Sequence, residues 1–419
     1  LKPLRLAPLL PAMHPRNRHR EYLDYRDLAE RQPSLRPFVF TNAFGGTSID
    51  YTDQQALREL TRCLLREFYG LLDWSIPDGH LCPPVPQRAD YIHGIADLLP
   101  AVEAGAAGPA RGAGIRGLDI GTGASCIYCL LGAREYGWSF VGSDIDDGAL
   151  ASAQAIVDGN RLAGQIELRQ QPDPDRVFAG VLRQGEAVAF CVCNPPFHES
   201  LEHARRAAGA KWQRLGRAVQ GKEMNYQGSP AELCCNGGEV GFVTRMAEES
   251  AQPRRQRACV WFSAMLSRES SIAPVRERLG ELGARRRAWE LRQGRTTKWV
   301  VAWTFYPRGE RDQRLREMAQ RRADPEARAE AGAEAATARD VGAGGDGADG
   351  VGGSLVRRSA GAGGSAAPEA GAPGEGQAVQ GGVGSKRPRR AEAVDRGSGG
   401  STAGSCEGDV EEHPARSGR

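Results

Sequence analysis

The last part of the chain lacks the residues that build a hydrophobic core. Tyr306 is the last aromatic residue of the 419, and from Ala331 onward there is no Phe, Trp, Tyr or Ile and a single leucine, Leu355. The same stretch holds 23 of the 54 glycines. Such a segment buries too little apolar surface to offset the entropy of ordering it. We therefore expect this tail to be disordered.

The chain also lacks a membrane span, a disulfide framework and a metal motif. No apolar run approaches the roughly 18 residues that a span needs. The ten cysteines show no even, short spacing and several lie in apolar runs, which favours reduced thiols. Cys126 and Cys129 form a CxxC, but no second pair stands at zinc spacing and the seven histidines are scattered. We predict no metal site and no membrane association.

We expect an intracellular protein, in the cytoplasm or nucleus, and a monomer. The acid-free stretch LKPLRLAPLLPAM at the start is compatible with a transit-peptide remnant, which leaves organellar import open. SKRPRR (385–390) could act as a nuclear import signal, although basic clusters in such tails are usually solvated charge.

Strand-like and helix-like segments alternate between Gly114 and Tyr306. The expected strands are 114–121, 138–144, 166–170, 188–193, 258–265, 287–293 and 298–306. The expected helices are 125–137, 146–160, 174–182, 239–250 and 271–283. Strands alternating with helices predict a parallel α/β sheet with helices on both faces, and the last two strands predict a closing antiparallel hairpin.

Three regions follow from this pattern. Residues 13–99 carry helical patterns and a basic start, so we expect a mostly helical N-terminal region, either a lobe or an extension wrapped on the sheet. Residues 100–307 would form the sheet domain. Residues 308–419 would form a charged segment, with a helix over Arg311–Arg328, followed by the disordered Gly/Ala-rich tail.

A glycine turn with two acidic residues marks a candidate cofactor site. The first predicted strand runs into D-I-G-T-G-A-S, and an aspartate ends the next strand about 20 residues later, where it can accept hydrogen bonds from ribose hydroxyls. The third glycine of a pyrophosphate-binding loop is absent. This combination suits a nucleoside without phosphates, such as S-adenosylmethionine. The candidate residues are Asp119, Gly121, Gly123, Ser125 and Asp144.

The fourth predicted strand ends in Asn194-Pro195-Pro196-Phe197. Proline cannot donate to a sheet ladder, so the strand must stop there in a stiff turn. In a doubly wound sheet this turn would face the same crevice as the glycine turn. The Asn194 side-chain oxygen and the Pro195 carbonyl could then hold an aromatic amine in line with a methyl donor, while Phe197 stacks on the base.

Several blocks resemble a known family. GLDIGTGASCIYCLLG, CNPPFHES, MHPRNRH, CPPVPQRADYIH and QGRTTKWVVAWTF, which together cover most of residues 13–306, are similar to the adenine-N6 methyltransferases of large-subunit ribosomal RNA. They are also similar to the family's eukaryotic relative, which methylates a small nuclear RNA and a messenger RNA.

The resemblance implies a class I, Rossmann-like methyltransferase fold, with Asn194–Phe197 gripping the adenine. It implies a cofactor pocket, for S-adenosylmethionine, that also includes Arg88 and Asn194. Relatives often have Glu where Asp144 stands, and the shorter side chain leaves less reach toward the ribose.

Two basic stretches are predicted to contact RNA. Each is free of acids, and the second is interleaved with tryptophan, a combination that tracks phosphates and stacks bases. The candidate residues are Arg16, Arg18 and Arg20 in the first stretch, and Arg205, Arg206, Lys211, Trp212, Arg214, Arg217 and Lys222 in the second. RNA readers generally take splayed single-stranded bases, so we expect the target adenine in a loop or bulge.

Three alternatives stay open. A small nuclear RNA or a messenger RNA hairpin could replace ribosomal RNA as substrate. A protein glutamine methyltransferase would use the same NPP turn but would have no use for the basic stretches. A non-catalytic RNA-binding protein could retain the fold, although the intact glycine turn and Asn194 argue against it.

Overall fold

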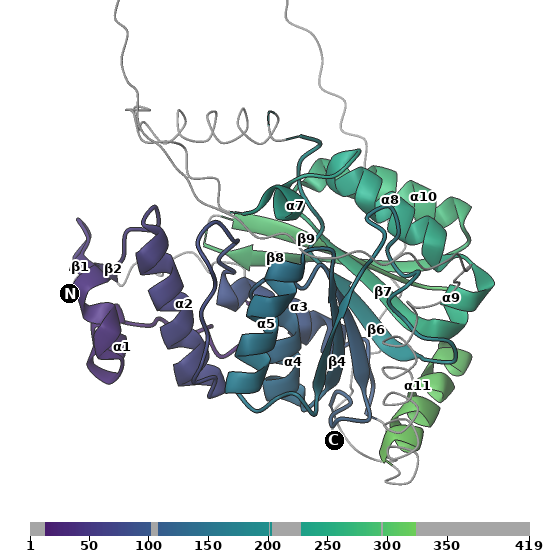
Figure 1. Cartoon of the computed structure of the whole chain (residues 1–419), viewed down its shortest axis with the longest axis horizontal. Helices are drawn as coiled ribbons and strands as arrows, with labels where there is room; N and C mark the ends of the chain where they lie inside the picture. The colour runs from purple at the N-terminus through teal and green to yellow at the C-terminus, as the bar shows by residue number, and fades with distance from the viewer. Residues whose placement is uncertain (1–12, 102–107, 201, 203–227, 295, 324–419) are drawn as a thin grey trace, which may run out of the picture. The chain divides into compact units, whose positions relative to one another are not determined.

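The computed structural model describes residues 13–101, 108–200, 202, 228–294 and 296–323. A seven-stranded sheet lies at the centre of this part of the chain (Figure 1). The strand order is β5-β4-β3-β6-β7-β9-β8. The strands are β3 (Arg116–Ile120), β4 (Ser139–Asp144), β5 (Ile166–Gln170), β6 (Val188–Cys193), β7 (Cys259–Leu266), β8 (Arg285–Gln293) and β9 (Thr296–Thr304). The first five in spatial order are parallel and β9 is antiparallel to both its neighbours, which confirms the predicted mixed sheet.

Helices cover both faces of this sheet, as predicted (Figure 1). Those after β3 are α4 (Ile127–Tyr136), α5 (Asp147–Gly159), α7 (Pro230–Leu233), α8 (Gly238–Ser250), α9 (Pro253–Ala258), α10 (Ile272–Glu281) and α11 (Arg308–Ala323). Adjacent strand residues enter opposite hydrophobic clusters: Phe140 packs in one and Val141 in the other, as do Phe190 and Cys191. Because side chains alternate along a strand, a strand buried on both faces reads as a continuous apolar run.

Local capping residues fix the ends of two of these helices. Asp146 accepts hydrogen bonds from the backbone N–H of Gly148 and Ala149 and so begins α5. Gly137, with a φ of 70°, ends α4 in the left-handed conformation that glycine adopts without strain.

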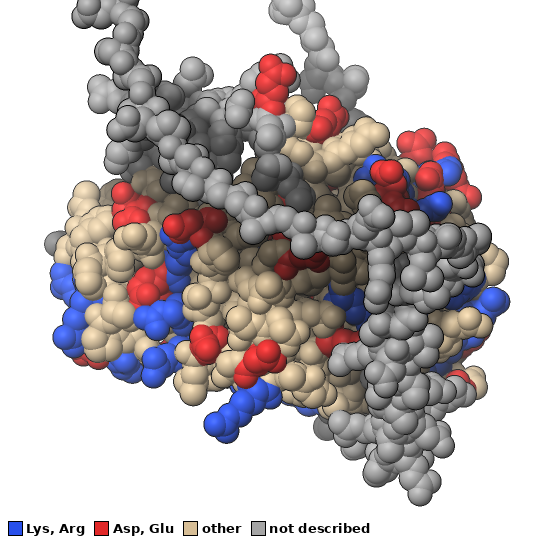
Figure 2. Space-filling model, viewed as in Figure 1, with Lys and Arg blue, Asp and Glu red and all other residues tan. Residues whose placement is uncertain are grey.

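The N-terminal region packs directly on the sheet domain. It consists of α1 (Tyr25–Arg31), the 3₁₀ helix η1 (Pro33–Phe38), the hairpin of β1 (Phe40–Thr41) and β2 (Thr47–Ser48), α2 (Gln54–Tyr69) and α3 (Val85–Ala96). Helix α3 contacts α4 and β8, and a β-carbon at Gly94 would lie 2.5 Å from Trp289 Nε1. Figure 2 shows acidic and basic side chains mixed over this region, at the left of the view.

The prediction of a helix over residues 174–182 is wrong. The segment is an irregular loop between β5 and β6. Its backbone donors bond to a side chain instead of to one another: the N–H groups of Val177 and Phe178 donate to the two carboxylate oxygens of Glu249 on α8, at 2.9 and 3.0 Å. Gly180 takes a φ of 89°, which no α-helix accommodates. The apolar residues of the segment are buried all the same, which explains their helix-like spacing.

The charged segment that follows the sheet begins as a helix, as predicted. Helix α11 lies beyond the predicted domain boundary at residue 307 and contacts β6 and β7. Leu315 and Ala319 on this helix are buried, and a β-carbon at Gly114 would lie 2.6 Å from the Ala319 carbonyl oxygen. The remainder of the predicted helix, residues 324–328, and the predicted disordered tail lie outside the described residues.

Replacing Glu249 should destabilise the fold. In Glu249→Ala two buried N–H groups lose their acceptors, so we expect the free energy of unfolding to fall by about 2–5 kcal/mol. Glu249→Gln keeps one acceptor oxygen and should give an intermediate loss. The matched control is Glu248→Ala, because Glu248 pairs with Arg278 at the surface and such pairs contribute at most about 1 kcal/mol. Urea unfolding measures all three, and equal losses at 248 and 249 would contradict this assignment.

Candidate active site

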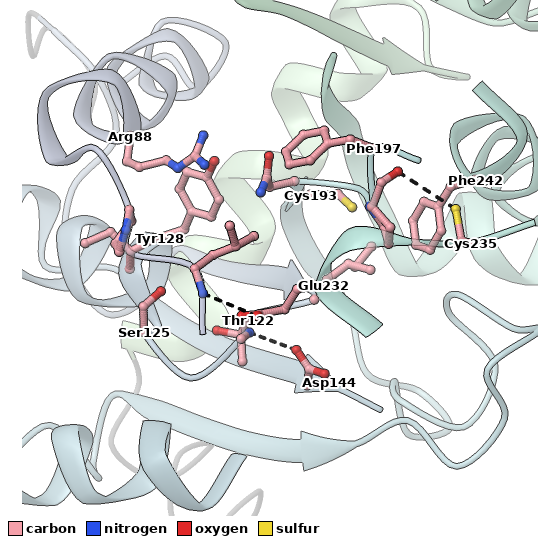
Figure 3. A pocket seen from close by; sticks show the side chains of 18 of the residues that line it. Arg88, Thr122, Ser125, Tyr128, Asp144, Cys193, Phe197, Glu232, Cys235 and Phe242 are labelled. Carbon is pink, nitrogen blue, oxygen red and sulfur yellow. Dashed lines mark hydrogen bonds between the residues drawn. The ribbon is translucent and has the colours of Figure 1, made fainter. Parts of the chain in front are cut away.

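A cavity of about 1170 Å³ lies at the carboxyl ends of β3, β4 and β6 (Figure 3). The strand order reverses between β3 and β6, which are parallel neighbours. Because Ile120 pairs with Cys193, the residues that follow them, Gly121 and Asn194, leave the sheet at the same edge. Ligands of open α/β sheets bind at such a reversal point.

Most predicted site residues line this cavity. They are Arg88, Gly121, Gly123, Ser125, Asp144, Asn194, Pro196 and Phe197. Two do not: Asp119 and Pro195 are buried in the surrounding structure.

The glycine turn is fixed by its backbone. Gly121 and Gly123 take φ angles of 70° and 61°, a conformation that favours glycine. The N–H of Gly121 donates to the Ser143 carbonyl, and the N–H of Gly123 donates to Asp144 Oδ2 at 2.8 Å. The other oxygen of Asp144 accepts from the N–H of Asp146 at 3.1 Å. Burial raises the pKa of Asp144, and these backbone bonds oppose that rise. The Asp144 carboxylate is therefore held at the cavity wall by two backbone donors.

Asp119 lies beneath the turn and supports it. Its side chain is fully buried, and its Oδ2 accepts from the Thr122 hydroxyl at 2.8 Å and from the Cys129 thiol at 3.6 Å. Its Oδ1 meets no donor within the described part of the chain. Burial raises the pKa of Asp119 to about 7. Because Asp119 does not reach the cavity, it can position the turn through Thr122 but cannot contact a bound ligand.

The NPPF turn, which borders the cavity, contains a buried and unpartnered acceptor. Asn194 lines the cavity, yet its Oδ1 is buried and accepts no hydrogen bond from the described residues. Beyond the turn, the His198 N–H donates to the Leu233 carbonyl and the Cys235 N–H donates to the His198 carbonyl, both at 2.9 Å. The turn is thus fixed by the sheet on one side and by this short backbone pairing on the other.

Phe197 and Arg88 lie at the end of the cavity away from the glycine turn (Figure 3). The Lys298 ammonium lies 5.2 Å from the centroid of the Phe197 ring. The Arg88 guanidinium is 5.6 Å from the Tyr128 ring centroid and 3.0 Å from Met265 Sδ. Arg88 is only 8% exposed and forms no ion pair with any carboxylate in the described ranges. Among the described residues it is therefore neither a surface arginine nor a salt-bridged one.

The sequence did not reveal Glu232, which also lines the cavity. Its carboxylate accepts from the N–H of Leu81 at 3.3 Å and from that of Ser229 at 2.7 Å, and lies 3.5 Å from His80 Nδ1. It joins the cavity wall formed by residues 81–84 to the segment after β6. No motif surrounds it. Leu81 lies directly before the CPPVPQRADYIH stretch that carries the family resemblance, and this proximity was the available signal.

The predicted RNA-binding arginines of the N-terminal region make contacts within the chain. Arg16 donates to the Tyr136 hydroxyl, the His93 carbonyl and Asp97. Arg18 donates to Glu135 and to the Phe68 carbonyl. Arg20 is exposed, and its one hydrogen bond given by the structure goes to the nearby Pro15 carbonyl. The second stretch lies outside the described residues: Arg205, Arg206, Lys211, Trp212, Arg214, Arg217 and Lys222.

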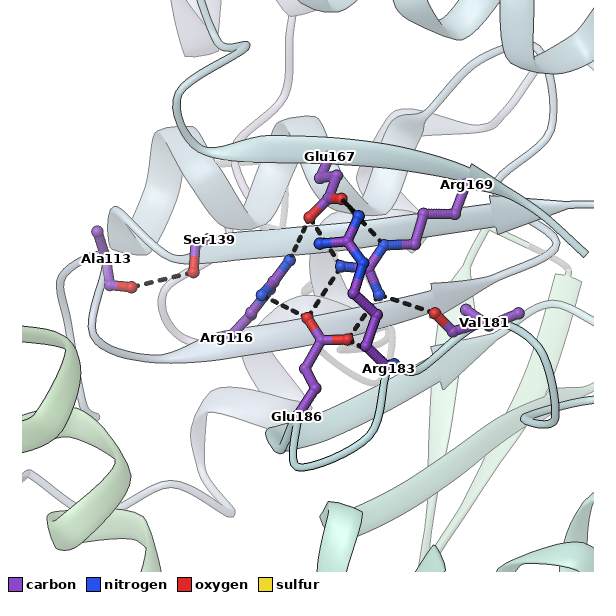
Figure 4. A network of polar contacts seen from close by, with 8 residues as sticks. All are labelled: Ala113, Arg116, Ser139, Glu167, Arg169, Val181, Arg183 and Glu186. Carbon is purple, nitrogen blue, oxygen red and sulfur yellow. Dashed lines mark hydrogen bonds and ion pairs between the residues drawn. The ribbon is translucent and has the colours of Figure 1, made fainter. Parts of the chain in front are cut away.

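Another charged cluster lies at the opposite end of β3 from the cavity (Figure 4). Arg116 and Arg169 each pair with both Glu167 and Glu186, and Arg183 pairs with Glu167. Burial alone would raise the pKa of Glu167, but the bonds from Arg169 and the nearby arginine charges hold it at about 2. Every carboxylate here has partners, so this network is structural and ties the loop before β6 to the sheet.

The described residues show neither a metal cluster nor a membrane span. Within those ranges no three metal-ligating side chains come together. None of the helices there combines the length and apolarity needed to cross a bilayer.

The fold and the position of the cavity define a class of proteins. The structure is similar to the human METTL16 catalytic domain in complex with MAT2A 3′UTR hairpin 1, with a TM-score of 0.59 and 34% identity over 71% of this chain and 96% of that one. It is also similar to the N-terminal domain of human METTL16 in complex with SAH, with a TM-score of 0.56 and 33% identity over 71% of this chain and all of that one. The chain has a Rossmann-like methyltransferase fold.

A family model described as RNA methyltransferase matches residues 8–307, and the chain belongs to this family. Its relatives include the ribosomal RNA large subunit methyltransferase F of Pseudomonas savastanoi, 44% identical over 74% of this chain and 98% of the relative. The protein of the same name from Stutzerimonas stutzeri is 47% identical over 70% of this chain and 90% of its own length. The predicted family is confirmed.

Replacing Asp119 by asparagine should change how stability depends on pH. The folded protein holds a proton on Asp119 up to a pKa of about 7, whereas the ordinary value is 3.8. Between these values the folded state binds more protons than the unfolded chain, so this residue makes stability fall as pH rises. Asparagine cannot ionise. The stability of Asp119→Asn relative to wild type should therefore rise from about pH 4 to about pH 7 and then level off.

Urea unfolding across this pH range measures the difference. The same substitution at the exposed Asp147 is the matched control. An equal pH-dependent change in both variants would contradict the assignment to the buried carboxyl.

Proposed function

We propose that this RNA methyltransferase transfers a methyl group from S-adenosylmethionine to the N6 amine of an adenine in large-subunit ribosomal RNA. The observation that carries the proposal is the buried Oδ1 of Asn194, a residue of the cavity wall, which lacks a donor among the described residues. A buried acceptor without a partner costs stability, so its retention favours a donor supplied by the substrate.

The cavity residues fit the proposed cofactor. Asp144 is placed to accept from ribose hydroxyls, and the turn around Gly121 and Gly123 lets a nucleoside approach the backbone. Arg88, which has no carboxylate partner within the described residues, is suited to the carboxylate of the cofactor's amino-acid part. Once bound, the sulfonium supplies the methyl group.

The protein's part in the reaction is orientation. The nitrogen lone pair of an aromatic amine is delocalised into the ring, and acceptors around the NH₂ group draw it toward tetrahedral geometry. We assign this role to Asn194 Oδ1 and to the backbone carbonyl of Pro195. Phe197 would stack on the extruded base, a contact worth about 1–3 kcal/mol. No strong base is needed, because the amine loses its proton after it has gained the methyl group.

Residues 13–99 would cap the cofactor and contribute to RNA binding. Tyr51, Arg88 and the segment 81–84 from this region line the cavity, which supports the first role. For the second role, Arg18 and Arg20 are the exposed members of their cluster, and Arg18 is already paired with Glu135. The basic stretch at residues 205–222 stays a proposal.

Ribosomal RNA is the preferred substrate because the relatives at 44–47% identity carry that name. A messenger RNA hairpin is the second candidate, since the similar METTL16 structure contains one.

The purified protein should form N6-methyladenosine in unmodified large-subunit ribosomal RNA supplied with S-adenosylmethionine. Nuclease digestion followed by mass spectrometry of the nucleosides identifies the product, and the MAT2A hairpin serves as the competing substrate. A methyl group on another base would contradict the adenine assignment. Preferential methylation of the hairpin would reverse the order of the two candidates.

Asn194→Ala should lower kcat by about 10²-fold or more, because one preorganised polar contact is lost. Cofactor affinity, measured by calorimetry, should stay nearly unchanged. Asn194→Asp keeps an acceptor oxygen and should retain more activity than the alanine variant. If cofactor affinity fell as much as kcat, Asn194 would only support the fold of the cavity.

A further inference from the structure

Exposed aromatic side chains gather in the N-terminal region. Among the described residues, six large hydrophobic side chains are exposed: Tyr22, Phe40, Phe44, Tyr51, Leu72 and Ile145. Four of these lie between residues 22 and 51, and all four are aromatic. Phe44 is 98% exposed. Scattered exposed apolar residues need no explanation, but a cluster of aromatic ones marks a contact surface.

The β1–β2 hairpin holds Phe44 away from the core. Asn42 Oδ1 accepts from the N–H of Phe44 at 2.9 Å and from that of Gly46 at 3.2 Å, which fixes the turn from within. A β-carbon at Gly46 would lie 3.6 Å from the Tyr22 hydroxyl, so Tyr22 borders the same turn. Tyr22 and Phe44 are therefore two exposed aromatic side chains at the same turn.

A series of contacts links this turn to the active-site cavity. The Tyr25 N–H donates to Thr47 Oγ1 on β2, and the Tyr25 hydroxyl lies 2.9 Å from that of Tyr51. Tyr51 lines the cavity and is also 54% exposed. Aromatic side chains thus connect the hairpin turn to the cavity.

The charge of this region does not favour phosphate binding. Residues 13–53 contain six Arg and no Lys, against six Asp and Glu. Attraction to phosphates comes from uncompensated Lys and Arg, whereas stacking needs only a flat π-face, which every base has.

We propose that Tyr22, Phe44 and Tyr51, the aromatic strip, stack on RNA bases that flank the target adenine. This inference rests on the proposed function and extends it, because it names where the RNA leaves the cavity. The strip supplies affinity by stacking and leaves the electrostatic part of binding to other residues.

The test measures binding directly, without methyl transfer. The probe is a protein-free transcript of bacterial large-subunit ribosomal RNA, and the variants are Phe44→Ala, Phe44→Trp and the double variant Tyr22→Ala/Phe44→Ala. Leu72→Ala is the matched control, since Leu72 is 65% exposed and lies outside the strip. These side chains are at the surface, and an unchanged melting temperature verifies that each variant folds.

The double variant should raise the Kd for RNA by about 5-fold or more, by the same factor at about 50 mM and about 200 mM salt. Phe44→Trp should bind at least as tightly as wild type, and Leu72→Ala should bind like wild type. Cofactor affinity should not change.

An unchanged Kd in the double variant, or an equal loss in Leu72→Ala, would overturn the proposal. So would a change in the salt dependence, which would show a phosphate contact. Altered self-association in sedimentation with RNA affinity intact would assign the strip to a second copy of the chain. If RNA binding follows the expected pattern but no methylated product forms, the proposed function would be wrong, while the role of the aromatic strip in RNA binding would stand.

Discussion

The parallel pairing of β3 with β6 is the constraint on which the site depends. It brings the glycine turn and the NPPF turn, far apart in sequence, to one sheet edge in a fixed register. A slip of one residue would turn every side chain of β6 to the opposite face. Because Phe190 and Cys191 fill separate hydrophobic clusters on the two faces, such a slip would disrupt both. The packing of the core therefore sets the position of Asn194.

Charge in the cavity is divided between its two ends. Asp144 and Glu232 line the wall near the glycine turn, whereas Arg88 and Lys298 line the end that includes Phe197. Each of the two acids is held by backbone N–H donors, and Glu232 also lies 3.5 Å from His80 Nδ1. A fixed separation of charge of this kind orients a ligand that carries both a cation and a carboxylate.

The sequence predicts the sheet and the two turns well because their signals are local. Strand ends, glycines at positive φ and prolines after a strand are set by backbone sterics, which the residue types determine. The helix expected at residues 174–182 failed because its donors bond to Glu249, a partner far along the chain. The sequence also missed Glu232 as a cavity residue and wrongly placed Asp119 at the cavity wall. The reason is the same, because burial and side-chain partners depend on tertiary contacts that residue spacing does not encode.

The arginines near the start of the chain show why residue counts do not assign a function. Arg16 and Arg18 donate to groups on α2, α3 and α4 and at their ends, so these two side chains fasten the N-terminal segment to the sheet domain. His14, in the same segment at the start of the chain, donates its backbone N–H to Asp90 Oδ1 on α3 at 3.0 Å. Asp90 lies two residues after Arg88 on α3. The N-terminal segment therefore braces the helix that supplies the arginine of the cavity, and positions the active site whether or not it also contacts RNA.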